Sequence, residues 1–224
     1  PSLSRKHAAK STEEFSDTID WALRWVFLIG TPAAIGLIYL AEPLLMTLFQ
    51  YGEFTVMDSH KASLSLMAYG LGLLPFIFIK VLAPGYYARQ DTKTPVKIGI
   101  IAMISNMALN VVLMIYLDHV GLALATALSA MLNAGLLYHG LRKRSVYTPN
   151  SGWGKFSLKL VIANSSLFVF LLLLNPQHNE WVIWDAWQRG GHLFGLIVGA
   201  AVTYFTFLLV LRINLKSLVR PIMR

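Results

Sequence analysis

The stretch KVLAPGYYARQDTKTPVK, residues 80–97, is a short, basic segment with a long apolar run on either side. Its Pro84-Gly85 pair weakens one helix near its end, because proline lacks an amide hydrogen and glycine leaves the backbone unrestrained. Thr94-Pro95 starts the next helix, since proline fits the first helical turn. The stretch therefore predicts a water-facing turn between two membrane helices.

The composition is that of a membrane protein. Of the 224 residues, 56% are hydrophobic and only 13% are charged, against about 25% charged residues in soluble domains. The net charge of +8 could indicate nucleic acid, but the cations are confined to short segments between apolar runs, as at a membrane surface. We therefore expect membrane lipids as partners and no nucleic acid. The chain has no cysteine, so it has neither disulfides nor a thiolate metal site.

Six segments have the roughly 20 mostly apolar residues that a spanning helix needs. In chain order they are Trp21–Ala41, Ala62–Tyr86, Val96–Leu117, Val120–Leu141, Phe156–Leu174 and Gly191–Leu211. Only Asp118-His119 separates the third from the fourth, which predicts a tight antiparallel hairpin. Because backbone polar groups in lipid must pair internally, we predict an all-α membrane protein with six transmembrane helices.

These spans divide the chain into four parts. Residues 1–19 predict a cytoplasmic amphipathic lead-in, and residues 20–141 a four-helix unit. Residues 142–155 predict a basic cytoplasmic loop, and residues 156–224 a final helix pair.

Two connections and one glycine ladder add detail. Residues 42–61 predict a short interfacial helix. Residues 175–189 predict a polar loop with tryptophans at the membrane interface, namely Trp181, Trp184 and Trp187. The last span carries Gly191, Gly195 and Gly199, a spacing that favours close helix packing, which we expect against the fifth span.

Basic residues are distributed unequally between the two sides of the predicted bundle. One set of connections and ends holds nearly all of them, whereas the opposite connections hold only Lys61 and Arg189. The rich set comprises Arg5, Lys6, Lys10, Arg89, Lys93, Lys97, Arg142, Lys143, Arg144, Lys155, Arg212, Lys216, Arg220 and Arg224. By the positive-inside rule, both chain ends and the turn at residues 80–97 are expected to be cytoplasmic.

Among the basic residues inside predicted spans, where charges often mark function, Arg24 and Lys80 stand out. Arg24 lies about one turn into the first span, and Lys80 lies near the cytoplasmic end of the second. Either they extend their charged ends to the lipid headgroups, or they line a cytoplasm-facing cavity that holds an anionic group. Their common position near one side slightly favours the shared cavity.

Neutral polar residues and prolines also interrupt the spans. Asn106 and Asn110 share one face of the third span, opposite Thr126 on the fourth. This pattern indicates hydrogen bonds between the two helices, each worth about 0.6 kcal/mol, or an oxygen cage for a small cation such as Na⁺. Pro32 and Pro75 are either hinges for a rocking motion or tolerated kinks.

The sequence holds no HExxH, GxSxG or P-loop motif, and no carboxylate pair within a span. These are the motifs of membrane hydrolases and ATP-driven pumps. An ATP-driven pump or a membrane hydrolase is therefore disfavoured.

Four segments together resemble the MurJ/MviN family of lipid II flippases. They are PSLSRKHA at the start, LFQYGEFT at residues 48–55, the stretch at residues 80–97, and LRKRSVYTP at residues 141–149 followed by Gly152-Trp153. The resemblance implies a two-lobed, fourteen-helix transporter of the MOP exporter superfamily, in the bacterial inner (cytoplasmic) membrane. This chain would be its C-terminal part, with the last six helices, and the N-terminal portion would be missing.

The resemblance also implies a substrate and its sites. Lipid II would move from the cytoplasmic to the periplasmic leaflet by alternating access, with its undecaprenyl tail in an apolar groove of the final helix pair. Candidate headgroup or entrance cations are Arg24, Lys80 and Arg89, and candidate hinges are Pro32, Pro75, Pro84 and Gly85. A family Na⁺ site would correspond to Asn106, Asn110 and Thr126, with Asn110 in place of an acidic ligand. No cofactor is implied beyond coupling to Na⁺, protons or the membrane potential.

Two rival functions stay open. A related exporter would move another polyprenyl-linked saccharide or a cation, although a cation substrate favours intramembrane carboxylates, which the spans lack. A protein of another class, a non-transporting membrane scaffold for cell-wall enzymes, would not depend on Arg24 or Lys80.

Overall fold

The computed structural model describes the backbone of residues 2–213 and the side chains of residues 13–213, and in this range it is all-helical. The helices are α1 (Ser2–Tyr39), α2 (Ala41–Phe49), α3 (Val56–Tyr87), α4 (Lys93–Lys143), α5 (Trp153–Leu174), α6 (His178–Ile183) and α7 (Ala186–Val210). The side chains of Arg5, Lys6 and Lys10, and all of Lys216, Arg220 and Arg224, lie outside the described residues.

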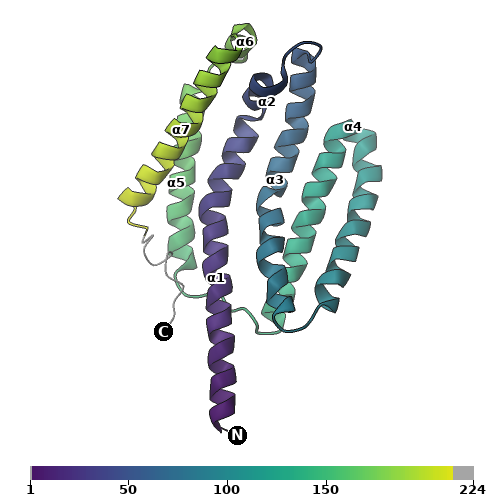
Figure 1. Ribbon diagram of the computed structural model, residues 1–224, viewed down its shortest axis with the longest axis vertical. Helices are drawn as coiled ribbons and strands as arrows, with labels where there is room; N and C mark the ends of the chain where they lie inside the picture. The colour runs from purple at the N-terminus through teal and green to yellow at the C-terminus, as the bar shows by residue number, and fades with distance from the viewer. Residues whose placement is uncertain (1, 214–224) are drawn as a thin grey trace.

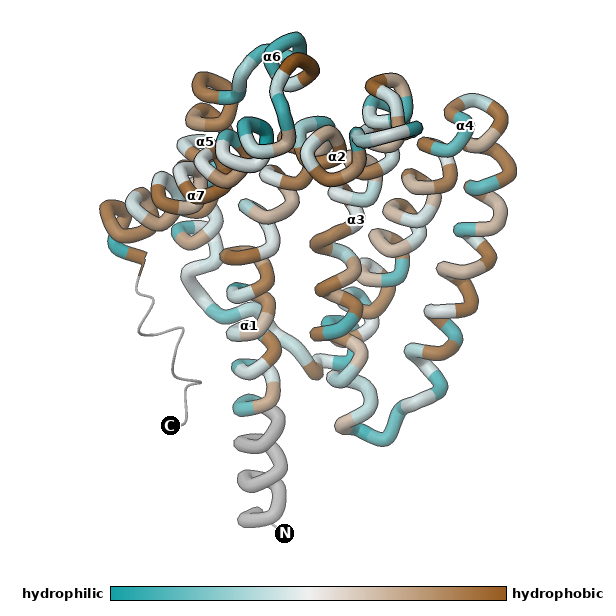
Figure 2. Tube along the Cα trace, turned by 45° about the horizontal axis from the view of Figure 1, so that its top comes forward, coloured by the Kyte–Doolittle hydropathy of each residue, from teal (hydrophilic) through white to brown (hydrophobic). Residues whose placement is uncertain are grey.

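The long helices stand side by side, with α1 in the middle (Figure 1). On one side α1 packs against α3, which packs against α4, and on the other side lie α5 and α7, which pack against each other. The short helices α2 and α6 cap the end opposite to the α3–α4 connection. Figure 2 shows hydrophilic residues at that connection and around α6, with hydrophobic residues along the helices between them.

Within the described residues, five helices are long and apolar enough to cross a membrane. One of them, α4, is interrupted at Asp118, whose φ of 48° is not helical, and its two arms run antiparallel (Figure 1). A side chain at Gly121 would overlap the Leu113 carbonyl, so only glycine permits this close turn. The hairpin predicted from Asp118-His119 is confirmed, and the expected spans at residues 96–117 and 120–141 are the two arms of α4.

Three boundaries differ from the sequence-based expectations. The lead-in and the first span form one continuous helix, α1. Helix α3 begins six residues before the expected span, because the Thr55 side chain accepts a hydrogen bond from the Asp58 amide and caps the helix. The expected polar loop after α5 contains α6, and its Trp181 is buried in the protein rather than exposed at an interface.

Helix α1 belongs to both hydrophobic cores of the described chain. Its Ile19 and Leu23 pack into the core formed with α3, α4 and the loop after α4. Its Leu28, together with Leu40 just after its end, packs into the core formed with α2, α5, α6 and α7. Of the glycine ladder in α7, Gly199 packs on the Phe170 ring of α5, as expected, whereas Gly191 and Gly195 face open space. Helix α1 therefore packs against the final helix pair on one side and against α3 and α4 on the other.

Candidate functional site: an apolar groove along α1

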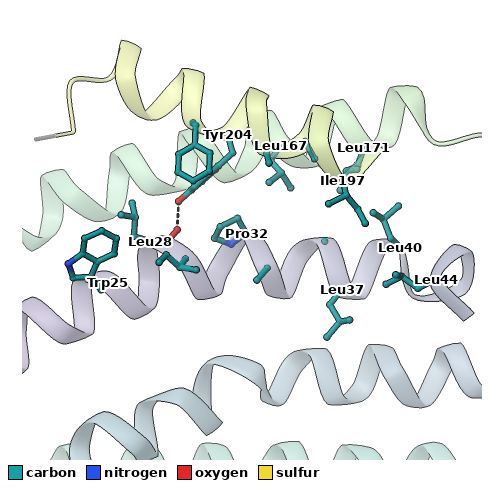
Figure 3. A pocket seen from close by; sticks show the side chains of 16 residues that line it. Trp25, Leu28, Pro32, Leu37, Leu40, Leu44, Leu167, Leu171, Ile197 and Tyr204 are labelled. Atoms are coloured by element: carbon teal, nitrogen blue, oxygen red, sulfur yellow. Dashed lines mark hydrogen bonds between the residues drawn. The ribbon is translucent and has the colours of Figure 1, made fainter. Parts of the chain in front are cut away.

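A groove with a volume of about 590 Å³ lies between α1, α2, α5 and α7 (Figure 3). Its walls are almost entirely apolar, with side chains such as Leu37, Leu44 and Ile197. The volume falls within the range of about 300–1,000 Å³ found for ligand sites. Its lining offers a ligand hydrophobic contact and almost no hydrogen bonding, so it suits a hydrocarbon chain.

The Tyr204 hydroxyl lies in the groove wall and is already bonded. It donates to the Leu28 carbonyl oxygen at 2.7 Å, which joins α7 to α1 (Figure 3). Pro32, predicted as a hinge, lies one turn after Leu28 and lines the same groove.

The middle of α1 is fastened to the loop after α4 by a buried carboxylate, Asp20. Its Oδ1 accepts hydrogen bonds from the Tyr147 hydroxyl at 2.9 Å, the Asn150 amide at 3.1 Å and the Trp153 indole N–H at 2.6 Å. Its Oδ2 accepts from Arg24 Nε at 2.8 Å. Burial, together with the Asp20 bond and charge, raises the pKa of Tyr147 far above its ordinary value. The carboxylate thus fixes where α5 begins relative to α1.

Arg24, a predicted headgroup cation, is part of this network. Besides its ion pair with Asp20, it donates to the Ser151 carbonyl at 3.2 Å. Its guanidinium lies over the rings of Trp153 and Phe156, 5.1 and 5.6 Å from their centroids. In this arrangement Arg24 holds the loop against α1.

The other two predicted cations are more available. The side chains of Lys80 and Arg89 are exposed, and within the described residues neither side chain makes a hydrogen bond or an ion pair. Pro84 and Gly85 lie between them inside α3, which continues to Tyr87. Pro75 lines a second cavity, of about 550 Å³, between α1, α3, α4 and the loop after α4.

The turn at residues 88–92 is tied to the end of α4. Asp91 accepts hydrogen bonds from the Thr94 hydroxyl at 2.7 Å and the Thr94 amide at 3.0 Å, and it pairs with Arg144. The Thr94 bonds, with help from Arg144, lower the pKa of Asp91 to about 2. The Arg144 guanidinium also lies over the Tyr86 ring. These bonds hold the turn of the basic stretch against the end of α4. We call residues 80–97 the basic rim.

The predicted polar stripe is assembled by the α4 hairpin. Asn106 Nδ2 donates to Thr126 Oγ1 at 3.4 Å and to Ser129 Oγ at 3.3 Å, and Asn110 Nδ2 donates to Asn106 Oδ1 at 3.1 Å. The hydrogen bonds expected between the arms are therefore present. Asn110 Oδ1 is buried and has no partner among the described residues, so it is the oxygen that a small cation would find free.

At the other end of the groove a buried arginine joins three elements. Arg189 of α7, 5% exposed, donates to the carbonyls of Trp181 at 2.8 Å, Val182 at 3.0 Å and Met46 at 3.0 Å. These bonds hold α7, α6 and α2 together. Nearby, Glu42 of α2 contacts His60 of α3 at 3.0 Å.

Comparison with known proteins assigns the chain. The family model described as lipid II flippase MurJ matches residues 1–189. The chain belongs to the MurJ family of lipid II flippases. A probable lipid II flippase MurJ of Vibrio cholerae is 47% identical over 220 residues, covering 97% of this chain and 42% of the relative. That of Haemophilus influenzae is also 47% identical, covering 96% of this chain and 43% of the relative.

A solved structure agrees on the fold. A lipid II flippase MurJ in an inward closed conformation matches 92% of this chain with a TM-score of 0.75 and 24% identity, over 40% of its own length. This MurJ-family chain thus spans less than half the length of these relatives, and it is a multi-pass membrane protein.

Sequence reasoning missed three residues that build the site: Asp20, Arg189 and Tyr204. Asp20 had one local signal, its spacing of four residues from Arg24. Arg189 had no such signal, because its sequence context is that of an ordinary basic residue in a loop. Tyr204 had an indirect one, since Pro32 leaves a carbonyl without its helical donor.

Proposed function

We propose that this chain is the C-terminal part of a flippase that moves lipid II from the cytoplasmic to the periplasmic leaflet by alternating access. Family membership over residues 1–189 and the names of the relatives support the substrate. The observation that carries the proposal is the apolar groove between α1, α2, α5 and α7.

The groove suits the undecaprenyl tail. An isoprenoid chain has no hydrogen-bonding groups, so a wall without free donors or acceptors loses nothing when the tail covers it. The tail would stay in this groove while the anionic headgroup crosses through a cavity between two lobes. This chain contributes one side of that cavity.

The membrane topology follows from the α4 hairpin and the cations. Counting the two arms of α4 separately, the five long helices make six crossings. An even number of crossings puts both chain ends on the same side, and the basic residues near the ends and in the basic rim at residues 80–97 support the cytoplasmic side of a bacterial inner membrane. The rest of a fourteen-helix, two-lobed transporter would come from the N-terminal portion.

Lys80 and Arg89 are the cations that best fit the headgroup or its entrance, because they are exposed and free of partners within the described residues. Arg24 acts with them only if its bonds to Asp20 and Ser151 open. Rocking of the lobes would bend α1 and α3 near Pro32, Pro75, Pro84 and Gly85. An ion gradient or the membrane potential would drive it.

Coupling to Na⁺ through Asn106, Asn110 and Thr126 is a second proposal, favoured by the free Asn110 oxygen. The three side chains supply neutral oxygens only, so a bound Na⁺ would need further oxygen ligands. Asn106→Ala should alter the Na⁺ dependence of transport, and an unchanged dependence would remove this site.

Complementation tests the main proposal. Flippase-depleted cells receive the full-length protein with Lys80→Ala, Arg24→Ala or, as a control in the same rim, Lys97→Ala. Periplasmic lipid II and the amount of protein in the membrane are measured. We expect Lys80→Ala to lower export at normal protein levels. Normal export with both Lys80→Ala and Arg24→Ala would exclude these cations from the mechanism, as a scaffold function requires.

A further inference from the structure

A hydrogen bond joins α7 to α1 in the wall of the apolar groove. The Tyr204 hydroxyl of α7 donates to the Leu28 carbonyl of α1 at 2.7 Å, and Tyr204 is only 2% exposed. Figure 3 shows the bond next to Pro32. The carbonyl of a residue inside an α-helix normally accepts from the amide four residues later. A second, external donor therefore needs an explanation.

Pro32 supplies that explanation. It stands four residues after Leu28, inside α1, and it has no amide hydrogen to donate. The Leu28 carbonyl is therefore without its helical partner, at a depth where no water replaces it. Leaving such a group unpaired in an apolar setting is unfavourable. Pro32 creates the acceptor, and Tyr204 satisfies it from the neighbouring helix.

This bond joins α7 to α1 at a distance from the hydrogen bonds that hold the two ends of the final helix pair. The first turn of α7 is held by Arg189, through the carbonyls of Trp181 and Met46, and the start of α5 is held by Asp20. Further along α7, Tyr204 makes the hydrogen bond that reaches α1 within the described residues. Its neighbours on α7, Ala200, Ala201 and Phe205, line the groove.

We propose that Tyr204 is a positioning residue that sets the width of the apolar groove, by holding α7 to the Leu28 carbonyl that Pro32 leaves free. Pro32 is then an anchor point for α7 in addition to the hinge proposed for it. The identity of the groove's ligand rests on the proposed function, whereas the Pro32–Leu28–Tyr204 link is a property of this chain alone.

Spin-label distances test the link directly. The chain has no cysteine, so Thr18→Cys on α1 and Leu209→Cys on α7, both exposed, report their separation in the full-length protein with any other cysteines replaced. We expect Tyr204→Phe to lengthen and broaden this distance. Tyr39→Phe is the matched control, because Tyr39 packs its ring on Phe168. An unchanged distance in Tyr204→Phe overturns the proposal.

A double-variant cycle separates positioning from ordinary stability. Pro32→Ala restores an amide that can satisfy the Leu28 carbonyl within α1. Tyr204→Phe should lower the folding equilibrium constant by about threefold, equivalent to ~0.6 kcal/mol, and by less in the Pro32→Ala background. The double variant should therefore recover stability while its label distance stays long. Equal losses in both backgrounds would show that Pro32 does not create the acceptor.

A photoreactive undecaprenyl phosphate measures occupancy of the groove in the same proteins. We expect labelling of α1 and α7 in the wild type and about threefold less in Tyr204→Phe. A second outcome is that the wild type shows no labelling of the groove while Tyr204→Phe still lengthens the label distance. That result would refute the tail site of the proposed function, and the positioning role of Tyr204 would still hold. Full labelling in Tyr204→Phe despite a longer distance would show that the groove width does not control tail binding, against the proposal.

Discussion

Asp20 is the side chain whose removal should most weaken the connection between the final helix pair and the rest of the chain. Asp20 is 2% exposed, and its carboxylate accepts four hydrogen bonds: two from the loop after α4, one from Trp153 at the start of α5 and one from Arg24. Asp20→Ala leaves Arg24 without its counter-ion and the loop without its acceptor. Breaking a buried ion pair from one side costs about 3–5 kcal/mol.

Asp20→Asn is the more informative change, because it keeps the shape. One amide oxygen can still accept from Tyr147 and Trp153, but the amide nitrogen then faces Arg24 Nε, donor against donor. We expect a loss of ~1.5–3 kcal/mol, the value of one hydrogen bond to a charged group. Unfolding of the full-length protein in detergent, followed by tryptophan fluorescence, measures it. Limited proteolysis of the loop should accelerate in parallel.

Asp17→Asn is the matched control. Asp17 lies on the same helix and accepts one hydrogen bond from the Asn150 side chain at 2.8 Å, but it is less buried than Asp20. Its change should cost about 1 kcal/mol or less. If Asp20→Asn is no more destabilising than Asp17→Asn, the buried carboxylate does not fasten the loop, and the reasoning fails.

Three further changes probe other contacts. Arg189→Met should destabilise the α2–α6–α7 junction by several kcal/mol, since each bond to a charged donor contributes about 1.5–3 kcal/mol, and Arg189→Lys should restore stability only in part. Thermal unfolding measures both changes, and an unchanged melting temperature in Arg189→Met would contradict the role of Arg189 in the junction. Because the pKa of Asp91 is lowered to about 2 from 3.8, its stabilisation of the turn is complete above about pH 4 and is lost as the pH falls towards 2; pepsin cleavage of the turn over this range should rise in the wild type and stay flat in Asp91→Asn. A Cβ at Gly72 would lie 3.1 Å from the Ala127 backbone, so Gly72→Ala should lower the melting temperature, at a cost of about 1–3 kcal/mol, whereas Gly135→Ala, with open space around it, should not; equal effects would argue against close α3–α4 packing.

Hydropathy alone predicts most of the fold, because a spanning helix has a length and composition that the bilayer imposes. The α4 hairpin was predictable for the same reason, since Asp118-His119 is the only polar break between two apolar runs. Helix α6 was not predictable, because it is short and its stability depends on burying Trp181 in the core shared with α2, α5 and α7 rather than on its own periodicity.

The site was less accessible to sequence reasoning because its partners are distant along the chain. Asp20 meets Tyr147 across 127 positions, and Tyr204 meets Leu28 across 176. Arg24 was noticed as an intramembrane charge, but its partners in the loop after α4 have no sequence signal of their own. The polar stripe was predictable because Asn106 and Thr126 lie on opposite arms of one hairpin, where spacing along the chain translates directly into proximity.

The carbonyl cage around Arg189 also has a consequence for biogenesis. Its acceptor on α2, the Met46 carbonyl, is synthesised 143 residues before it. We therefore expect that α2 lacks this contact until α7 is inserted. A guanidinium entering that region without acceptors is strongly disfavoured, so α7 can settle only where α2 and α6 already present their carbonyls. The arginine thus makes insertion of the last helix conditional on correct placement of an early one.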